Sequence, residues 1–104
     1  MFYNNSTSKT EQRKWGALYN WYTINSQKLA PEGWRIATNE DWKQLENYLI
    51  ANNYNYDGTT NTNKIAKALA TKTDWNNSEN PGTIGNNLTG NNTSSFNALP
   101  GGYR

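Results

Sequence analysis

Residues 29–42 are Leu29-Ala30-Pro31-Glu32-Gly33-Trp34-Arg35-Ile36-Ala37-Thr38-Asn39-Glu40-Asp41-Trp42, and more of the architecture can be predicted from them than from any other segment. Pro31 fixes φ and Gly33 can adopt a positive φ, so the two residues predict a turn. Residues 34–36 are then predicted to form a short strand. Thr38 can accept a hydrogen bond from the backbone N–H of Asp41, whose carboxylate can reach back, and this capping box predicts a helix start.

Apolar residues recur with helical spacing after this start. Trp42, Leu45 and Leu49 lie three and four positions apart and predict one face of a helix that ends at residues 52–53. A second, weaker helix is predicted over residues 64–71, where Asn63 can cap the N-terminus. Its short apolar stripe consists of Ile65, Ala68 and Leu69. Eight residues rarely remain helical in isolation, so packing has to support this helix.

Aromatic residues take the place of missing aliphatic ones. The chain has five Trp and seven Tyr but no Val, and each large ring can bury about 150–250 Å². Residues 15–24 concentrate bulky, β-favouring side chains and predict a strand or extended segment that is buried on both sides for part of its length. We therefore expect an aromatic core into which Trp34, Trp42 and Phe96 point. The Asn-rich remainder of the chain is expected to form loops.

Three motifs resemble those of the Fibrobacter succinogenes major paralogous domain. They are the Pro-x-Gly-Trp turn with its Thr and Trp at residues 31–42, Gly16-Ala17-Leu18-Tyr19-Asn20-Trp21-Tyr22, and Phe96-Asn97-Ala98-Leu99-Pro100-Gly101-Gly102-Tyr103-Arg104. The resemblance implies an α+β, C-type-lectin-like fold in which two helices flank a small, mainly antiparallel sheet. Residues 15–104 would be the N-terminal portion of this single lectin-like domain. Residues 1–14 are expected to be a polar lead-in that is open to disorder.

The resemblance also implies that the sheet is incomplete, because such domains continue past the position of Arg104 with further strands. An incomplete sheet exposes backbone N–H and C=O groups that need a partner. Self-association into a homo-oligomer through the unpaired sheet edge, or a compensating strand from residues 1–14, would supply one. A cropped chain, a gene fragment and cleavage after Arg104 are alternative explanations of the early end.

Composition excludes several classes of chemistry. The chain has no Cys and no His, which removes disulfides, thiolate nucleophiles, a His general base and the usual zinc sites. The oxygen-dependent enzymes of the resembled fold hold copper through cysteines, so their activity is not expected either. The net charge is +2 and the basic residues are scattered, which disfavours nucleic-acid binding. No apolar stretch is long enough for a membrane span, and the first residues lack the features of a signal peptide.

Aromatic and asparagine side chains supply the candidate ligand contacts. An exposed ring can stack on a sugar face while amides donate to and accept from its hydroxyls. The candidates for ligand binding are Trp75, Asn76, Asn77, Tyr54 and Tyr56. An Asn-rich loop that binds nothing is the alternative interpretation of the same residues.

Neither a metal site nor a catalytic pair is predicted. Residues 53–58 resemble the first half of a calcium loop, but the twelfth position falls on Lys64, where a bidentate Glu is needed. Glu40 and Asp41 could suggest a carboxylate pair, but the dipole of the predicted helix already explains acids in its first turn. The sequence therefore predicts no catalytic residue, no metal and no cofactor.

These features together favour a non-enzymatic binding module. The resemblance implies that it is exported or displayed at a bacterial cell surface, with its signal or anchor outside this chain. It would present loops to a glycan or protein ligand. The alternative is a structural or assembly module that self-associates by strand complementation.

Overall fold

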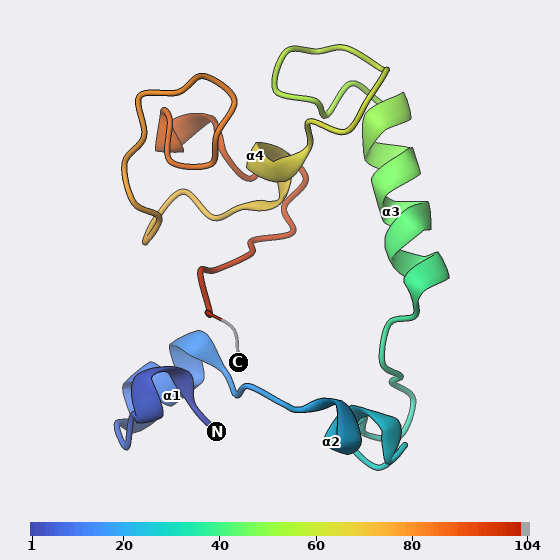
Figure 1. Cartoon of the computed structure of the whole chain (residues 1–104), viewed down its shortest axis with the longest axis vertical. Coiled ribbons are helices and arrows are strands. Elements are labelled where there is room, and N and C mark those ends of the chain that lie inside the picture. The colour runs from blue at the N-terminus through green and yellow to red at the C-terminus, as the bar shows by residue number, and fades with distance from the viewer. Residues whose placement is uncertain (103–104) are drawn as a thin grey trace. The chain divides into compact units, whose positions relative to one another are not determined.

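The computed structural model describes residues 1–102, and its regular elements are short helices (Figure 1). In chain order these are η1 (Tyr3–Asn5), α1 (Lys9–Trp15), α2 (Trp21–Asn25), α3 (Asn39–Ala51), α4 (Ala66–Leu69) and η2 (Leu88–Gly90). The chain divides into two compact units. The first contains Met1–Ala37 and, among the described residues, Gly101 and Gly102, and the second is Thr38–Pro100.

The predicted α+β, C-type-lectin-like fold, with two helices flanking a small antiparallel sheet, is wrong for the described residues. Residues 1–102 contain no sheet. Two isolated bridges join extended segments, one antiparallel between Phe2 and Ala17 and one parallel between Ala70 and Ala98. The unpaired sheet edge that was expected to drive self-association is therefore absent from this part of the chain.

Capping groups explain why residues 15–24 do not form the predicted strand. Gly16, with a φ of 70°, ends α1. The side-chain oxygen of Asn20 accepts from the backbone N of Thr23 at 2.9 Å and starts α2. Because this N-cap satisfies a backbone donor locally, the segment turns into a helix and its β propensity is overridden.

The turn at Pro31 is confirmed, but the strand predicted after it is wrong. The backbone N of Trp34 donates to the carbonyl of Pro31 at 3.0 Å, and Gly33 has a φ of 82°. Residues 34–36 then pair with no other strand in the described chain. Trp34 is 78% exposed, so its ring supplies none of the burial that would hold a strand in place.

Residues 1–14 form η1 and most of α1 and supply no strand beyond the single bridge at Phe2. Ser8 caps α1 by accepting from the backbone N of Glu11. The ring of Tyr3 stacks on that of Trp15, with 4.7 Å between the centroids. The boundary expected between residues 14 and 15 thus falls inside a helix.

The capped helix of the second unit is confirmed. Thr38 Oγ1 accepts from the backbone N of Asp41 at 3.2 Å, and Asp41 Oδ2 accepts from the backbone N of Thr38 at 2.7 Å. α3 ends at Ala51, close to the predicted end, and the chain turns at Asn53, where φ is 65°. Leu49 is the residue of the predicted apolar face that becomes buried.

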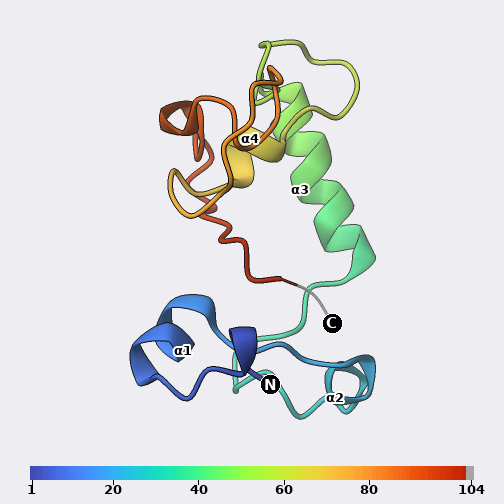
Figure 2. The same cartoon turned by 60° about the vertical axis from the view of Figure 1, so that its left-hand side comes forward.

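α4 is shorter than the helix predicted over residues 64–71, and the expected Asn63 side chain does not cap it. It ends at Leu69 because the next backbone groups are used elsewhere. The N of Ala98 donates to the carbonyl of Leu69, and the N of Thr71 donates to the carbonyl of Ala98, both at 2.8 Å. Figures 1 and 2 show the loop after α3 leading into α4 within this unit.

The predicted aromatic core is wrong. Trp42 and Phe96 contact each other edge to face, with centroids 6.1 Å apart, yet they are 51% and 46% exposed. Of the described residues, the buried apolar ones are Leu49, Ile65, Ala68 and Ala70, and the buried polar ones are Asn55, Lys67, Thr71 and Asn91. Polar side chains fill the interior beside small apolar ones because hydrogen bonds to loop carbonyls compensate their desolvation.

Candidate functional site

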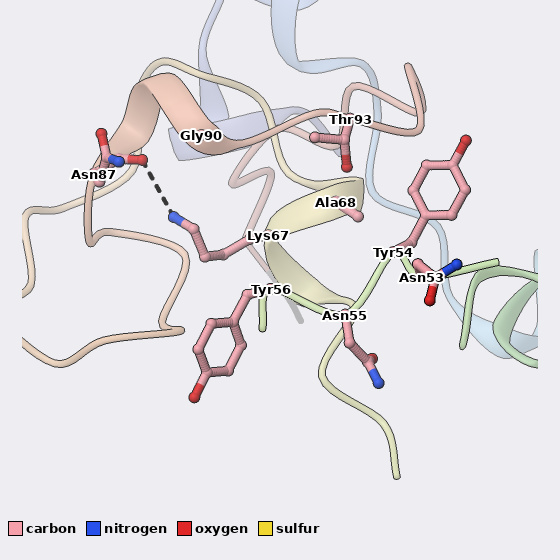
Figure 3. Close-up of a pocket in the computed structure, with 9 residues that line it drawn as sticks. All are labelled: Asn53, Tyr54, Asn55, Tyr56, Lys67, Ala68, Asn87, Gly90 and Thr93. Carbon is pink, nitrogen blue, oxygen red and sulfur yellow. Dashed lines mark hydrogen bonds between the residues drawn. The ribbon is translucent and has the colours of Figure 1, made fainter. Parts of the chain in front are cut away.

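A cleft of about 330 Å³ lies in the second unit (Figure 3). The segment that follows α3, the α4 helix and the loop around η2 each contribute to its wall. The lining residues are Asn53, Tyr54, Asn55, Tyr56, Lys67, Ala68, Asn87, Gly90 and Thr93. The cleft therefore joins two of the predicted ligand contacts to residues that are more than thirty positions away in the sequence.

Backbone hydrogen bonds position the two tyrosines at the cleft. The N of Tyr54 donates to the carbonyl of Leu49 at 3.0 Å, and the N of Tyr56 donates to the carbonyl of Lys64 at 3.2 Å. Tyr56 is 50% exposed, whereas Tyr54 is partly buried. Figure 3 shows the two rings pointing away from each other on either side of the segment. A flat ligand can therefore stack on one ring at a time.

Gly82 supports the ring of Tyr56. A Cβ atom placed on Gly82 would lie 2.3 Å from Cε1 of Tyr56, closer than atoms can approach, and the φ of Gly82 is 82°. Only glycine combines this backbone conformation with such a close neighbour at little cost. The ring of Tyr56 therefore lies directly against the loop that contains Gly82.

Asn55 has a structural role although it stands between the two tyrosines. Its Nδ2 donates to the carbonyls of Thr59, Asn61 and Thr62 at 3.0–3.1 Å, and its Oδ1 accepts from the backbone N of Lys64 at 2.8 Å. The residue is only 4% exposed, and Figure 3 shows its side chain directed away from the tyrosine rings. Asn55 thus closes the loop over residues 55–64 and leaves the tyrosines as the contact residues of this segment.

An ion pair closes the same loop at its surface. Lys64 Nζ lies 2.5 Å from Asp57 Oδ2, and Asp57 Oδ1 accepts from the N and Oγ1 of Thr59. The hydrogen bond from Lys64, followed by that from Thr59, lowers the pKa of Asp57 to about 2, and the bond to Asp57 raises the pKa of Lys64. The acid of the calcium-loop-like segment is therefore already paired with the lysine at its twelfth position.

Lys67 contributes the aliphatic part of its side chain to the cleft, and its ammonium is directed into the loop around η2. Figure 3 shows the hydrogen bond from Nζ to the carbonyl of Asn87, at 3.2 Å. Burial lowers the pKa of Lys67, because desolvation penalises the charged form. The ammonium is occupied by protein oxygens and is directed away from a ligand in the cleft.

The other three predicted contacts lie outside the cleft. Trp75 is partly buried, and its Nε1 donates to Thr71 Oγ1 at 3.1 Å, so the indole anchors its loop. Asn76 and Asn77 are exposed. A Cβ atom on Gly85 would lie 1.9 Å from the carbonyl oxygen of Asn76, so the backbone at Gly85 is in close contact with the backbone at Asn76. Tyr54 and Tyr56 both line the cleft, whereas Trp75, Asn76 and Asn77 lie in a separate loop.

The sequence did not predict the cleft residues that lie in and around η2, which are Asn87, Gly90 and Thr93. It also missed Lys67, although a signal existed. Lys67 lies between Ile65 and Ala68 in a short apolar stripe, and a cation in that place requires buried oxygen partners. The Asn87 and Thr93 side chains carried no comparable signal, because asparagine and threonine are frequent throughout the chain.

Two further features of the described chain concern metal binding and membrane insertion. Residues 1–102 contain no group of three or more His, Cys, Asp or Glu side chains that could hold a metal ion. No helix in the same range has the length and apolar character needed to cross a membrane.

The model of the Fibrobacter succinogenes major domain matches residues 1–104. No curated protein and no solved structure matches the chain.

Proposed function

The chain belongs to the Fibrobacter succinogenes major domain family, and on that premise we propose that it is a non-enzymatic binding module that is exported or displayed at the cell surface. Its ligand is a carbohydrate, held in the cleft at Tyr54 and Tyr56. The observation that carries the proposal is the position of Tyr56, half exposed at the edge of a 330 Å³ cleft. Exposed aromatic rings are the surfaces on which sugar rings stack.

The chemistry of the cleft also favours a carbohydrate. The groups that remain for a ligand are the hydroxyls of Tyr54, Tyr56 and Thr93, the amide of Asn53 and the amide nitrogen of Asn87, whose Oδ1 accepts from Thr89 Oγ1. These uncharged donors and acceptors match the hydroxyl groups of a sugar. Asn55 and the ammonium of Lys67 are excluded from this set, because loop carbonyls already occupy them.

The same lining residues favour binding over hydrolysis. None of the nine is a carboxylate, an imidazole or a thiol, the groups that most often act as general acids, bases or nucleophiles. The nearest acid in sequence, Asp57, is held by Lys64. The side chains that the cleft presents therefore support a binding role.

A glycan array tests the proposal, followed by titration calorimetry on the glycans that bind. We expect Tyr56→Ala to weaken binding at least about fivefold, since loss of a stacking ring removes about 1–3 kcal/mol. Tyr48→Ala is the control, because Tyr48 is 60% exposed on α3 and does not line the cleft. An array without specific binding, or equal losses in the two variants, would contradict the proposal.

Two glycine variants test the position of the ring without removing it. Gly82→Ala forces a Cβ into Tyr56, whereas Gly58→Ala introduces the same kind of strain, at a φ of 72°, with no atom within 4 Å of the new Cβ. We expect binding to fall in Gly82→Ala and to be retained in Gly58→Ala. Retained binding in both would show that the ligand does not contact the ring where Gly82 holds it.

A second candidate is a structural or assembly module that self-associates. The first unit favours it, because Trp21, Tyr22 and Trp34 are 66%, 78% and 78% exposed, and exposed apolar surface commonly mediates association. Strand complementation requires a sheet edge, and residues 1–102 have none. In this candidate, self-association would therefore be mediated by the exposed rings. Sedimentation velocity over a range of protein concentrations tests this candidate, and a constant monomeric mass excludes it.

A further inference from the structure

The ammonium of Lys67 lies in a cage of four oxygen atoms. Nζ donates to the carbonyl of Asn86, to the carbonyl of Asn87 at 3.2 Å, to the carbonyl of Thr83 at 3.5 Å and to Oδ1 of Asn91 at 2.8 Å. Lys67 is 9% exposed and Asn91 is 1% exposed, so water is largely excluded from the cage. Three of the four oxygens belong to the backbone of one loop.

The cage has its own internal support. The Nδ2 of Asn91 donates to the carbonyls of Thr71 and Ile84 at 2.9 and 3.0 Å, which fixes the direction of Oδ1. The N of Asn86 donates to the carbonyl of Thr83 at 3.1 Å and holds the first turn of the loop. These bonds do not involve Lys67, so Oδ1 of Asn91 and the carbonyl of Thr83 are positioned independently of the lysine side chain.

The charge of the cage specifies the kind of cation that fits it. All four oxygens are neutral, whereas Ca²⁺ and Mg²⁺ sites depend on carboxylates. Rings of neutral carbonyl oxygens replace the hydration shell of monovalent cations in proteins. An ammonium group supplies three N–H donors and one positive charge, and the cage satisfies both.

We propose that residues 83–91 form a monovalent-cation site whose resident cation is the ammonium of Lys67. Shortening the side chain opens the site, and free ammonium or potassium then occupies it. Removing the cation without replacement takes the donor from the carbonyl of Asn86 and from Oδ1 of Asn91, whereas the carbonyls of Thr83 and Asn87 still accept from the backbone N of Asn86 and of Gly90. The loss of a donor is costly in a buried position. The stability of the loop is therefore coupled to the presence of a small cation in this place.

Chemical rescue of Lys67→Ala tests the site. Thermal unfolding is followed in ammonium chloride and in tetramethylammonium chloride at equal ionic strength, since tetramethylammonium has no N–H donor and is too large for the cage. We expect the melting temperature of Lys67→Ala to be at least about 3 °C higher in ammonium chloride. A variant that folds only in ammonium chloride would support the proposal in the same way.

Two matched variants separate rescue from general salt effects. Lys67→Met retains an apolar stem that fills the space, so it is expected to be destabilised without an ammonium response. Lys43→Ala removes an exposed lysine whose partner is Glu40 on α3, and its melting temperature is expected to follow that of the unchanged protein. The proposal is overturned if Lys67→Ala, folded or unfolded, responds to the two salts in the same way as these controls.

The unchanged protein offers an independent measurement. Lysine ammonium protons that are caged should exchange with water at least about tenfold more slowly than those of an exposed lysine. We expect this protection for Lys67 and rapid exchange for Lys43 in nitrogen-resolved NMR spectra. Exchange at Lys67 as rapid as at Lys43 would contradict a closed oxygen cage.

Discussion

At the scale of single residues, the second unit depends on a few buried polar side chains that each bind several loop carbonyls. Asn55, Lys67 and Asn91 each make at least three hydrogen bonds to groups that are distant in the sequence or on separate turns of a loop. The loops have few apolar residues to bury, so these bonds determine their conformation. Side chains that look interchangeable in an Asn-rich sequence therefore have unequal effects on stability.

Comparing Asn55→Ala with a variant of an exposed asparagine measures this difference in their contributions to stability. The substitution leaves the carbonyls of Thr59, Asn61 and Thr62 and the N of Lys64 without their partner. We expect the free energy of unfolding in urea to fall by about 1–3 kcal/mol. Asn61→Ala is the control, because Asn61 is exposed and contributes its backbone carbonyl, which alanine retains. Equal losses in the two variants would show that Asn55 is not the centre of the loop.

The pKa of Asp57 gives a prediction about pH. The folded-state value is about 2 and the ordinary value is 3.8, so ionised Asp57 stabilises the folded loop above pH 3.8. That contribution is lost as the pH falls through this range toward 2. We expect the Asp57 carboxyl carbon to titrate near pH 2 in NMR spectra and the midpoint to rise toward 3.8 in Lys64→Ala. An unchanged midpoint in that variant would exclude the ion pair as the main cause.

At the scale of elements, helix starts are set by local caps, and α3 is the best example. Thr38→Ala removes one half of its capping box and should lower the free energy of unfolding by about 1 kcal/mol. Glu40→Ala is the control in the same first turn, since Glu40 pairs with Lys43 at an exposed position and should change stability by less than about 0.5 kcal/mol. Urea unfolding measures both, and similar small losses would contradict a stabilising role for the cap.

The contrast between α3 and α2 shows which elements could be predicted from the sequence. The start of α3 could be predicted from Thr38 and Asp41, because the whole capping box lies within four residues. Residues 15–24 carried a similar local signal, the Asn20 cap, but the bulky side chains around it favoured a strand. The end of α4 could not be predicted, because it depends on backbone pairing with Ala98, almost thirty residues away.

The candidate site also contains residues that could be predicted from the sequence and residues that could not. Tyr54 and Tyr56 could be selected from the sequence because exposed tyrosines next to asparagines suit a sugar. The partners across the cleft, Asn87 and Thr93, are set by how the later loop folds back onto α4. Trp75 was selected for its size, but the bond from its indole to Thr71 makes it an anchor of its own loop.

At the scale of the whole molecule, the two units differ in how their side chains are used. The second unit buries four polar side chains, those of Asn55, Lys67, Thr71 and Asn91, and contains the cleft. The first unit exposes the rings of Trp21 and Trp34, and the stacking of Tyr3 on Trp15 contributes a contact within it. A ligand site in the second unit and an association surface in the first are compatible, and measurements on the complete chain can separate them.

Chemical-shift mapping of the complete chain with a glycan that binds on the array tests the central claim most directly. The account predicts that the largest shifts occur at Tyr56, Tyr54, Thr93 and Asn87. It also predicts that Trp34 and Trp75 change little and that Tyr56→Ala abolishes the pattern. Shifts concentrated at Trp34 or Trp75, or a pattern that persists in Tyr56→Ala, would contradict the assignment of carbohydrate binding to this cleft.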